Sequence, residues 1–139
     1  MARVLIVDDD MAIRQAMRAC LEDANHTVQE ARDGAGALVI LRESRESLIA
    51  LVDLHMPVMS GYDLLQLVAG DRNLARRHVY VLVTANTESL PVVQALRSQI
   101  VLAGIAKPFD LDTLLEAVTE AEEYLPAAAD ERLPFAFDV

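Results

Sequence analysis

The chain has 139 residues, 53% of them hydrophobic, and its 22 acidic side chains against 12 basic ones give a formal net charge of −10. This length suits one domain with a core of its own, and a single cysteine, Cys20, excludes an intramolecular disulfide and fits a reducing, cytoplasmic location. The sequence predicts neither a membrane span nor a signal peptide, and so acidic a surface disfavours direct binding to nucleic acid.

The first half of the chain alternates short apolar runs with segments of helical periodicity. The runs are rich in β-branched residues, which is typical of strands buried on both faces. Aspartates precede the helical segments, where their side chains can accept hydrogen bonds from the first backbone N–H groups. In order, the pattern predicts a strand over 4–7, a helix capped by Asp9 or Asp10, a weaker strand over 27–31, a helix capped by Asp33 and a strand over 48–52.

The second half continues the alternation and ends in a segment of different composition. In order, it predicts a helix from Ser60 to Gly70, a polar, basic loop over 71–78, a strand over 79–83, a helix from Pro91, a strand over 101–106 and a helix capped by Asp110. Two histidines, His26 and His78, fall in predicted connections, where we expect solvated side chains. Residues 126–139 lack a helical stripe, so we expect a domain over 1–125 followed by a tail or the start of a linker.

Five strand–helix pairs in succession predict an α/β fold, with a parallel sheet and helices on both of its faces. Ligands bind such sheets at the carboxyl ends of the strands. Polar residues stand at those ends here, namely the aspartates at 8–10, then Asp53, Thr84 and Lys107. We therefore expect carboxylates, a hydroxyl and an amine to meet at one edge of the sheet.

This set of side chains indicates phosphoryl chemistry with a hard cation. Clustered carboxylates offer oxygen ligands that suit Mg²⁺, and an aspartate beside Mg²⁺ can act as a nucleophile toward phosphorus. A lysine amine and a hydroxyl can then pair with the oxygens of the transferred group. Taken alone, the aspartates at 8–10 also fit a solvated helix start, since acidic side chains favour helix N-termini.

Four motifs in chain order resemble the receiver domain of two-component response regulators, of the single-domain, chemotaxis-regulator kind. They are VLIVDDD at 4–10, DLHMPVMSGYD at 53–63, VTA at 83–85 and KPF at 107–109. The resemblance covers about residues 3–124. It implies a five-stranded, doubly wound, flavodoxin-like sheet in the order 2-1-3-4-5 with five helices. It also implies a signalling switch that catalyses only its own phosphorylation and dephosphorylation.

The resemblance further implies roles for matching positions. Asp53 would accept the phosphoryl group from a histidine kinase or phosphotransfer protein, and Thr84 and Lys107 would bind its oxygens. Mg²⁺ would be held by Asp9, Asp53 and the backbone carbonyl of His55, with Asp8 holding metal-bound water. The remaining implied features are a cis peptide bond between Lys107 and Pro108 and a rim formed by His55, Ala85 and Asn86.

One position departs from the family pattern. Many receivers carry an aromatic residue three positions before the lysine, and this chain has Gly104 there. The usual aromatic coupling between phosphate and output surface is therefore missing. Apolar residues of the helix from Pro91 and of the strand over 101–106 suggest instead a face for a homodimer or for an unknown downstream protein.

Two other functions compete with the signalling switch. A phosphatase of the haloacid dehalogenase type also forms an aspartyl phosphate, but that family places a second aspartate two residues after the nucleophile, where this chain has His55. A non-phosphorylated receiver that serves only as an interaction module is the other alternative.

Overall fold

The computed structural model describes residues 1–85 and 100–126, and within them five strands form one parallel sheet in the order β2-β1-β3-β4-β5. The predicted fold class and strand order are therefore confirmed. The strands agree with the predicted segments to within one residue at each end. They are β1 (Arg3–Val7), β2 (Thr27–Ala31), β3 (Ile49–Val52), β4 (Val79–Thr84) and β5 (Val101–Ala106).

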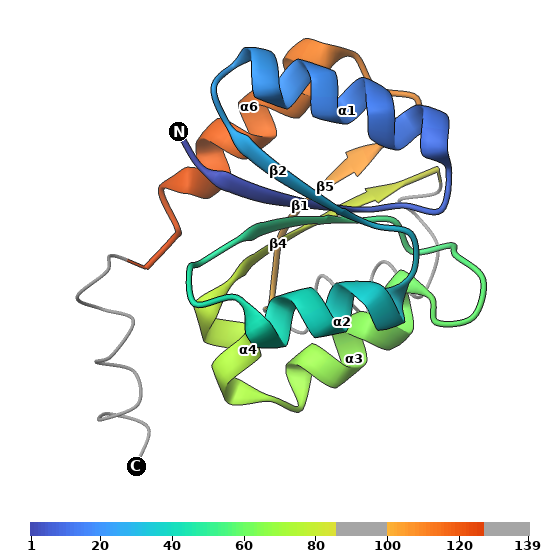
Figure 1. Ribbon diagram of the computed structural model, residues 1–139, viewed down its shortest axis with the longest axis vertical. Coiled ribbons are helices and arrows are strands. Elements are labelled where there is room, and N and C mark those ends of the chain that lie inside the picture. Colours follow the sequence, from blue (N-terminus) through green and yellow to red (C-terminus); the bar gives the residue numbers. More distant parts are fainter. Residues whose placement is uncertain (86–99, 127–139) are drawn as a thin grey trace.

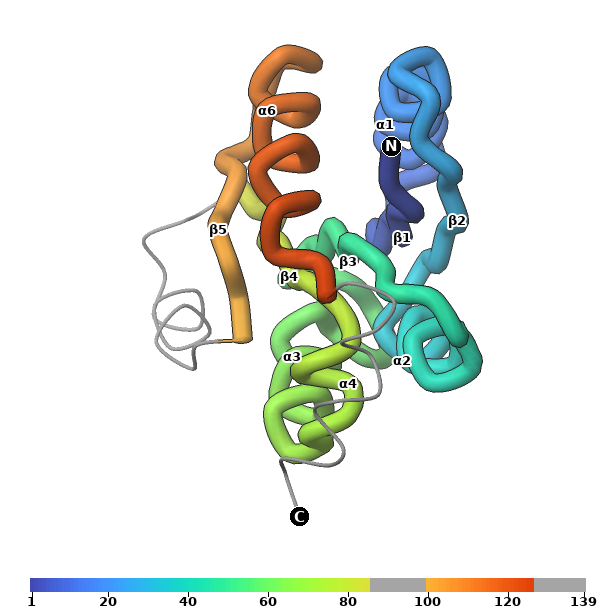
Figure 2. The backbone as a smooth tube through the Cα atoms, turned by 90° about the vertical axis from the view of Figure 1, so that its left-hand side faces the viewer, coloured from blue at the N-terminus to red at the C-terminus, as the bar shows by residue number. Residues whose placement is uncertain are grey.

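Helices cover both faces of the sheet. Helices α1 and α6 pack on one face, and α2, α3 and α4 pack on the other (Figure 1). Figure 2 shows the same two layers from the side, with the sheet between them. Their bounds are α1 (Met11–Asp23), α2 (Gly34–Glu43), α3 (Gly61–Ala69), α4 (Arg72–Arg77) and α6 (Leu111–Glu122). None of these helices is long and apolar enough to cross a bilayer.

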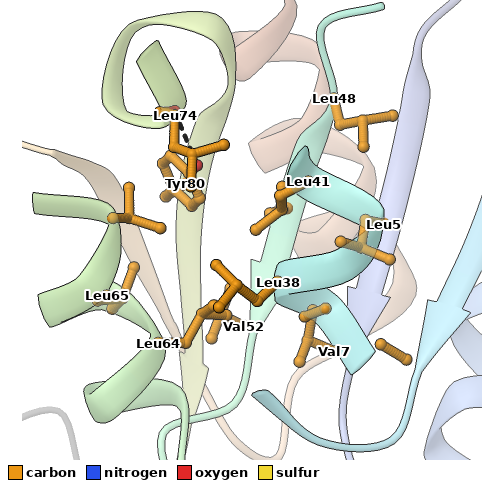
Figure 3. Close-up of a cluster of buried hydrophobic side chains, with 14 of the residues drawn as sticks. Leu5, Val7, Leu38, Leu41, Leu48, Val52, Leu64, Leu65, Leu74 and Tyr80 are labelled. Carbon is orange, nitrogen blue, oxygen red and sulfur yellow. Dashed lines mark hydrogen bonds between the residues drawn. The ribbon is translucent and has the colours of Figure 1, made fainter. Parts of the chain in front are cut away.

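A separate hydrophobic cluster lies on each face of the sheet, because alternate side chains of a strand point to opposite faces. The cluster under α2, α3 and α4 includes Leu5, Val52 and Tyr80, all fully buried (Figure 3). The other cluster lies under α1 and α6 and includes Ile6 and Val81. The central strands β3 and β4 are buried along their whole length. Their continuous apolar runs thus have the burial that the sequence predicts.

The register of the strands decides which residues meet at the carboxyl edge. Val7 pairs with Val52, and Val52 pairs with Leu82, so β1, β3 and β4 end at nearly the same level. Backbone hydrogen bonds continue past the ends, from the Asp53 N–H to the Val7 carbonyl at 2.9 Å and from the Lys107 N–H to the Thr84 carbonyl at 2.8 Å. This alignment brings the polar residues after the three strands to one edge.

Residues 71–78 are not the loop that the sequence predicts. They contain the short helix α4, whose N-cap Asp71 accepts hydrogen bonds from the N–H groups of Asn73 and Leu74. Leu74 is buried in the core and its carbonyl accepts the Tyr80 hydroxyl at 2.9 Å (Figure 3). The two apolar residues of α4, Leu74 and Ala75, are adjacent, so the segment has no helical periodicity to detect, and tertiary contacts contribute to the stability of so short a helix. The predicted helix from Pro91 lies outside the described residues.

The prediction that His26 and His78 are solvated is wrong. Both are buried, and each accepts a backbone N–H at Nδ1, from Ala2 at 3.0 Å and from Leu48 at 2.9 Å respectively. The Nε2 of His78 also lies 2.9 Å from the Leu41 carbonyl. With Nδ1 as acceptor, Nε2 must carry the proton and donate. His78 therefore links the end of α2 to the strands β3 and β4 at the edge opposite the candidate site.

Replacing His78 by phenylalanine is expected to lower the free energy of unfolding by about 3 kcal/mol, because it leaves the Leu48 N–H and the Leu41 carbonyl buried without partners. Urea unfolding followed by circular dichroism measures the change. His55→Phe is the control, since an exposed side chain should change stability by less than about 0.5 kcal/mol. Equal stability of both variants would contradict the proposed importance of the two hydrogen bonds.

Candidate functional site

Three aspartates form a cluster at the carboxyl edge of the sheet. Asp8 and Asp9 follow β1, Asp53 follows β3, and one carboxylate oxygen from each lies within 4.8 Å of the others. Asp8 and Asp53 are 2% and 6% exposed, whereas Asp9 is exposed to solvent. Three carboxylates this close repel one another unless a cation neutralises them. All-oxygen ligands on one open side suit Mg²⁺.

Local backbone contacts hold the two buried carboxylates in place. The Asp8 N–H donates to the Ala31 carbonyl at 3.1 Å, and Asp8 Oδ1 accepts the Asp10 N–H at 2.9 Å. Asp53 Oδ1 accepts the N–H of His55 at 3.2 Å. Each carboxylate therefore has one oxygen fixed by a turn of its own segment. This leaves the second oxygen, Oδ2, to meet groups from other strands.

Lys107 brings a positive charge from the end of β5 to both carboxylates. Its Nζ lies 2.7 Å from Asp8 Oδ2 and 3.3 Å from Asp53 Oδ2. The preceding strand aims it there, and the Lys107–Pro108 peptide bond is cis, the form that the resemblance implies. Burial alone lowers the pKa of Lys107, but the hydrogen bond to Asp8 and the charges of Asp53 and Asp8 outweigh it, and the pKa is raised.

Burial affects the pKa of Asp53 in the direction opposite to its effect on Lys107. Loss of solvent raises the pKa of this carboxyl above its ordinary value, and the hydrogen bond from His55 and the charge of Lys107 only partly offset this effect. A carboxylate that has lost part of its solvation is a stronger nucleophile than a fully solvated one. Asp53 therefore has the environment expected of a reacting group.

Thr84, at the end of β4, contributes a hydroxyl without a partner. The residue is fully buried, and in the described part of the chain its Oγ1 is the one buried side-chain oxygen or nitrogen that makes no hydrogen bond. Such a group costs about 1–3 kcal/mol unless something pairs with it. The hydroxyl therefore fits a site that binds an oxygen-bearing ligand.

Of the other predicted site residues, the structure describes His55, Ala85 and Gly104. His55 is exposed and lines a hollow of about 480 Å³ together with Met56, Pro57 and Tyr62. Ala85 is exposed, and Asn86 lies outside the described residues. Among the described residues, no atom lies within 4 Å of a Cβ placed at Gly104, so none of them fills the position of the missing aromatic residue.

Sequence reasoning missed one contact of the site and left one signal in the sequence unused. Arg14 of α1 donates from Nη1 to the Asp8 carbonyl at 2.7 Å, a contact to backbone that leaves no mark in the sequence. The unused signal concerns Lys107, which the sequence did predict for the site: it is the only lysine of the chain, and the other 11 basic residues are arginines. A single lysine among arginines is a reason to look for a specific role.

A doubly wound sheet with clustered carboxylates, a lysine and an unpaired hydroxyl at its carboxyl edge defines a class of proteins built for phosphoryl and cation chemistry. The response regulator receiver domain model matches residues 4–119. The chain belongs to this family, whose members are phosphorylation-dependent switches of two-component signalling rather than classical enzymes. This membership decides against a phosphatase of the haloacid dehalogenase type.

Individual relatives agree with the family. Chemotaxis protein CheY-3 of Vibrio cholerae is 34% identical over 125 residues, which cover 88% of this chain and 93% of that protein. Transcriptional regulatory protein GlrR of Escherichia coli K12 is 31% identical over 131 residues, and the chain spans only 28% of its length. The crystal structure of a CheY-like receiver domain protein from Methanospirillum hungatei is 29% identical with a TM-score of 0.78, covering 89% of this chain and 96% of that one.

Replacing Lys107 by alanine is expected to tighten Mg²⁺ binding about tenfold, because the ammonium group repels a cation placed among the same carboxylates. The phosphorylation rate should fall, since the lysine no longer pairs with a phosphoryl oxygen. Isothermal titration calorimetry measures the affinity. The control Lys107→Arg keeps the charge and should stay near the wild-type affinity. Weaker binding by the alanine variant would show that Lys107 organises the cation site rather than competes with the cation.

Proposed function

We propose that this chain is a receiver that takes a phosphoryl group onto Asp53, in the presence of Mg²⁺, from a histidine kinase or phosphotransfer protein. The observation that carries the proposal is the meeting of three groups from three strand ends. They are the buried Asp53 carboxylate, the Lys107 ammonium 3.3 Å from it, and the unpartnered hydroxyl of Thr84. Together they supply a nucleophile and two donors for phosphoryl oxygens.

The residues present fit the Mg²⁺ site that receiver domains have. Asp8, Asp9 and Asp53 offer carboxylate oxygens within 4.8 Å of one another, and the His55 carbonyl is the fourth expected contributor. Asp8 is the one that we assign to a metal-bound water. When bound, Mg²⁺ offsets the repulsion among these carboxylates and the negative charge of the incoming phosphoryl group.

In the proposed reaction, an oxygen of Asp53 forms a bond to phosphorus as the bond to the donor's leaving atom breaks. Lys107 donates to one phosphoryl oxygen and Thr84 to another, which stabilises the charge on the transferred group. By donating to a phosphoryl oxygen, the Thr84 hydroxyl gains the hydrogen-bond partner that it lacks. Hydrolysis later returns the Asp53 carboxylate, and His55, Ala85 and Asn86 line the rim that water crosses.

The proposed organisation is a receiver domain over residues 1–125 and a tail or linker over 126–139. A cytoplasmic location and an unknown downstream protein are part of the same proposal. So is a homodimer through the predicted helix from Pro91 and the β5 face. With Gly104 at that position of β5, no aromatic side chain there connects Thr84 to the output surface.

Incubation with acetyl phosphate and Mg²⁺, followed by mass spectrometry of the intact protein, tests this function. A switch gains one phosphoryl group and loses it again slowly after the donor is removed. A chelator added before the donor should prevent the gain. No mass change under any condition would support the interaction module that is never phosphorylated. Continuous turnover of the donor without a stable adduct would mean that the aspartyl phosphate is hydrolysed as fast as it forms.

A further inference from the structure

The guanidinium group of Arg14 bridges the cation site and strand β2. From α1, its Nη1 donates to the Asp8 carbonyl at 2.7 Å and its Nε donates to Glu30 Oε1 at 2.9 Å. The Arg14 side chain is only 14% exposed. The planar guanidinium can make both bonds at once, because its donors point in fixed, different directions.

The carbonyl that Arg14 contacts belongs to the peptide unit that joins Asp8 to Asp9. Fixing this peptide plane fixes the backbone dihedral angles on either side of it, and so the directions in which both side chains leave the chain. The Asp8 N–H is already held by the Ala31 carbonyl. With Arg14 in place, the backbone of Asp8 is tied to β2 on one side and to α1 on the other.

Glu30 orients Arg14 and compensates its charge. Its two carboxylate oxygens accept from different arginines, Oε1 from Arg14 and Oε2 from Arg18 at 2.6 Å. The hydrogen bond from Arg18, opposed by partial burial and aided by Arg14, lowers the pKa of Glu30, so this carboxylate is ionised at neutral pH. A cation bound beside Asp8 therefore lies near an arginine whose charge is compensated by Glu30. Arg18 makes the same kind of ion pair but pairs onward with Glu22, away from Asp8.

We propose that Arg14 is a positioning residue of the divalent-cation site: it holds the peptide joining Asp8 and Asp9, and Glu30 keeps it in place. This inference rests on the proposed function, since it assumes that these aspartates bind Mg²⁺. The two possible effects of replacing Arg14 change the affinity for Mg²⁺ in opposite directions. Removal of a positive charge alone tightens cation binding, whereas loss of positioning weakens it.

Isothermal titration of the full chain with MgCl₂ tests the inference in three variants. Arg14→Met removes both hydrogen bonds and keeps the apolar stem, and it should weaken Mg²⁺ binding about tenfold. Arg14→Lys keeps the charge but replaces the separate Nε and Nη1 donors with a single nitrogen, so its affinity should lie between that of Arg14→Met and that of wild type. Arg18→Met, the matched control, loses an ion pair to the same Glu30 without touching Asp8, and should stay within about twofold of wild type.

Thermal unfolding in the presence of a chelator separates folding from binding for each variant. Similar unfolding temperatures of Arg14→Met and Arg18→Met, with only the first weakened in Mg²⁺ affinity, support the inference. Unchanged or tighter binding by Arg14→Met, or equal weakening in both variants, overturns it. Should Arg14→Met fail to fold, wild-type affinity of Arg14→Lys overturns it in the same way. Absence of Mg²⁺ binding by the wild-type chain would instead overturn the cation site of the proposed function.

Discussion

Asp53→Asn is expected to abolish covalent phosphorylation of the chain by acetyl phosphate while leaving it folded. The amide has nearly the shape of the carboxylate, and its oxygen can still accept the His55 N–H that now lies 3.2 Å from Asp53 Oδ1. It lacks the charge and nucleophilicity that form an acyl phosphate. Mass spectrometry of the intact protein should show full modification of wild type and none of the variant.

Asp33→Asn is the matched control for this substitution. It removes the same charge from a helix N-cap whose side chain accepts the Gly36 N–H at 2.7 Å, and asparagine caps a helix about as well as aspartate. The control should be phosphorylated at the wild-type rate. Labelling of Asp53→Asn at that same rate would show that another residue accepts the phosphoryl group, with Asp8 and Asp9 the next to be replaced.

Asp53→Asn should also be more stable than wild type at neutral pH in the absence of Mg²⁺. Burial raises the pKa of Asp53, so the folded state binds this proton more tightly than the unfolded state. Wild type therefore loses stability as pH rises from the unfolded value, about 3.9, through the folded pKa. Asparagine has no such loss. Urea unfolding at several pH values should show the largest advantage of the variant near pH 7 and a diminishing one below pH 4.

The positions of the candidate site residues could be predicted because a simple rule connects them to the sequence. Asp8, Asp53, Thr84 and Lys107 each follow a continuous apolar run, and parallel strands in register end at one edge. The rule needs only the strand boundaries, which β-branched composition marks well. It predicts that these side chains converge, but not that Lys107 pairs more closely with Asp8, at 2.7 Å, than with Asp53, at 3.3 Å.

What the sequence could not predict depends on backbone partners that no pattern encodes. His78 can be buried because its ring nitrogens pair with the Leu48 N–H and the Leu41 carbonyl. In the sequence, a histidine in a polar segment looks the same whether its side chain is buried or solvated. Helix α4 has two adjacent apolar residues, Leu74 and Ala75, which give no helical periodicity, and a helix of six residues depends on its packing. Arg14 looks like any arginine on a helix surface until the Asp8 carbonyl is placed beside it.

Gly61→Ala is expected to destabilise the fold about as strongly as His78→Phe. Gly61 is the first residue of α3, and its N–H donates to the Leu54 carbonyl at 3.1 Å. A Cβ at this position would lie 2.0 Å from the Asp53 carbonyl oxygen and 2.8 Å from Val52 Cγ1. The first of these obstacles is backbone, so no rotamer change relieves it. We expect the free energy of unfolding to fall by about 3 kcal/mol.

Gly61→Ala should also reduce phosphorylation, because the backbone that must move to make room for the Cβ is that of Asp53. If α3 is pushed from the end of β3, the Asp53 carboxylate leaves its place beside Asp8 and Lys107, and phosphorylation should slow even at temperatures where the variant remains folded. Gly70→Ala, at the other end of α3, is the matched control. Its Cβ would meet its nearest neighbour, the Leu67 carbonyl oxygen, at an ordinary 3.7 Å, so stability should change by less than about 1 kcal/mol. Wild-type stability and labelling of Gly61→Ala would mean that α3 can shift without moving Asp53, and that the close approach is not needed to hold the phosphorylation site.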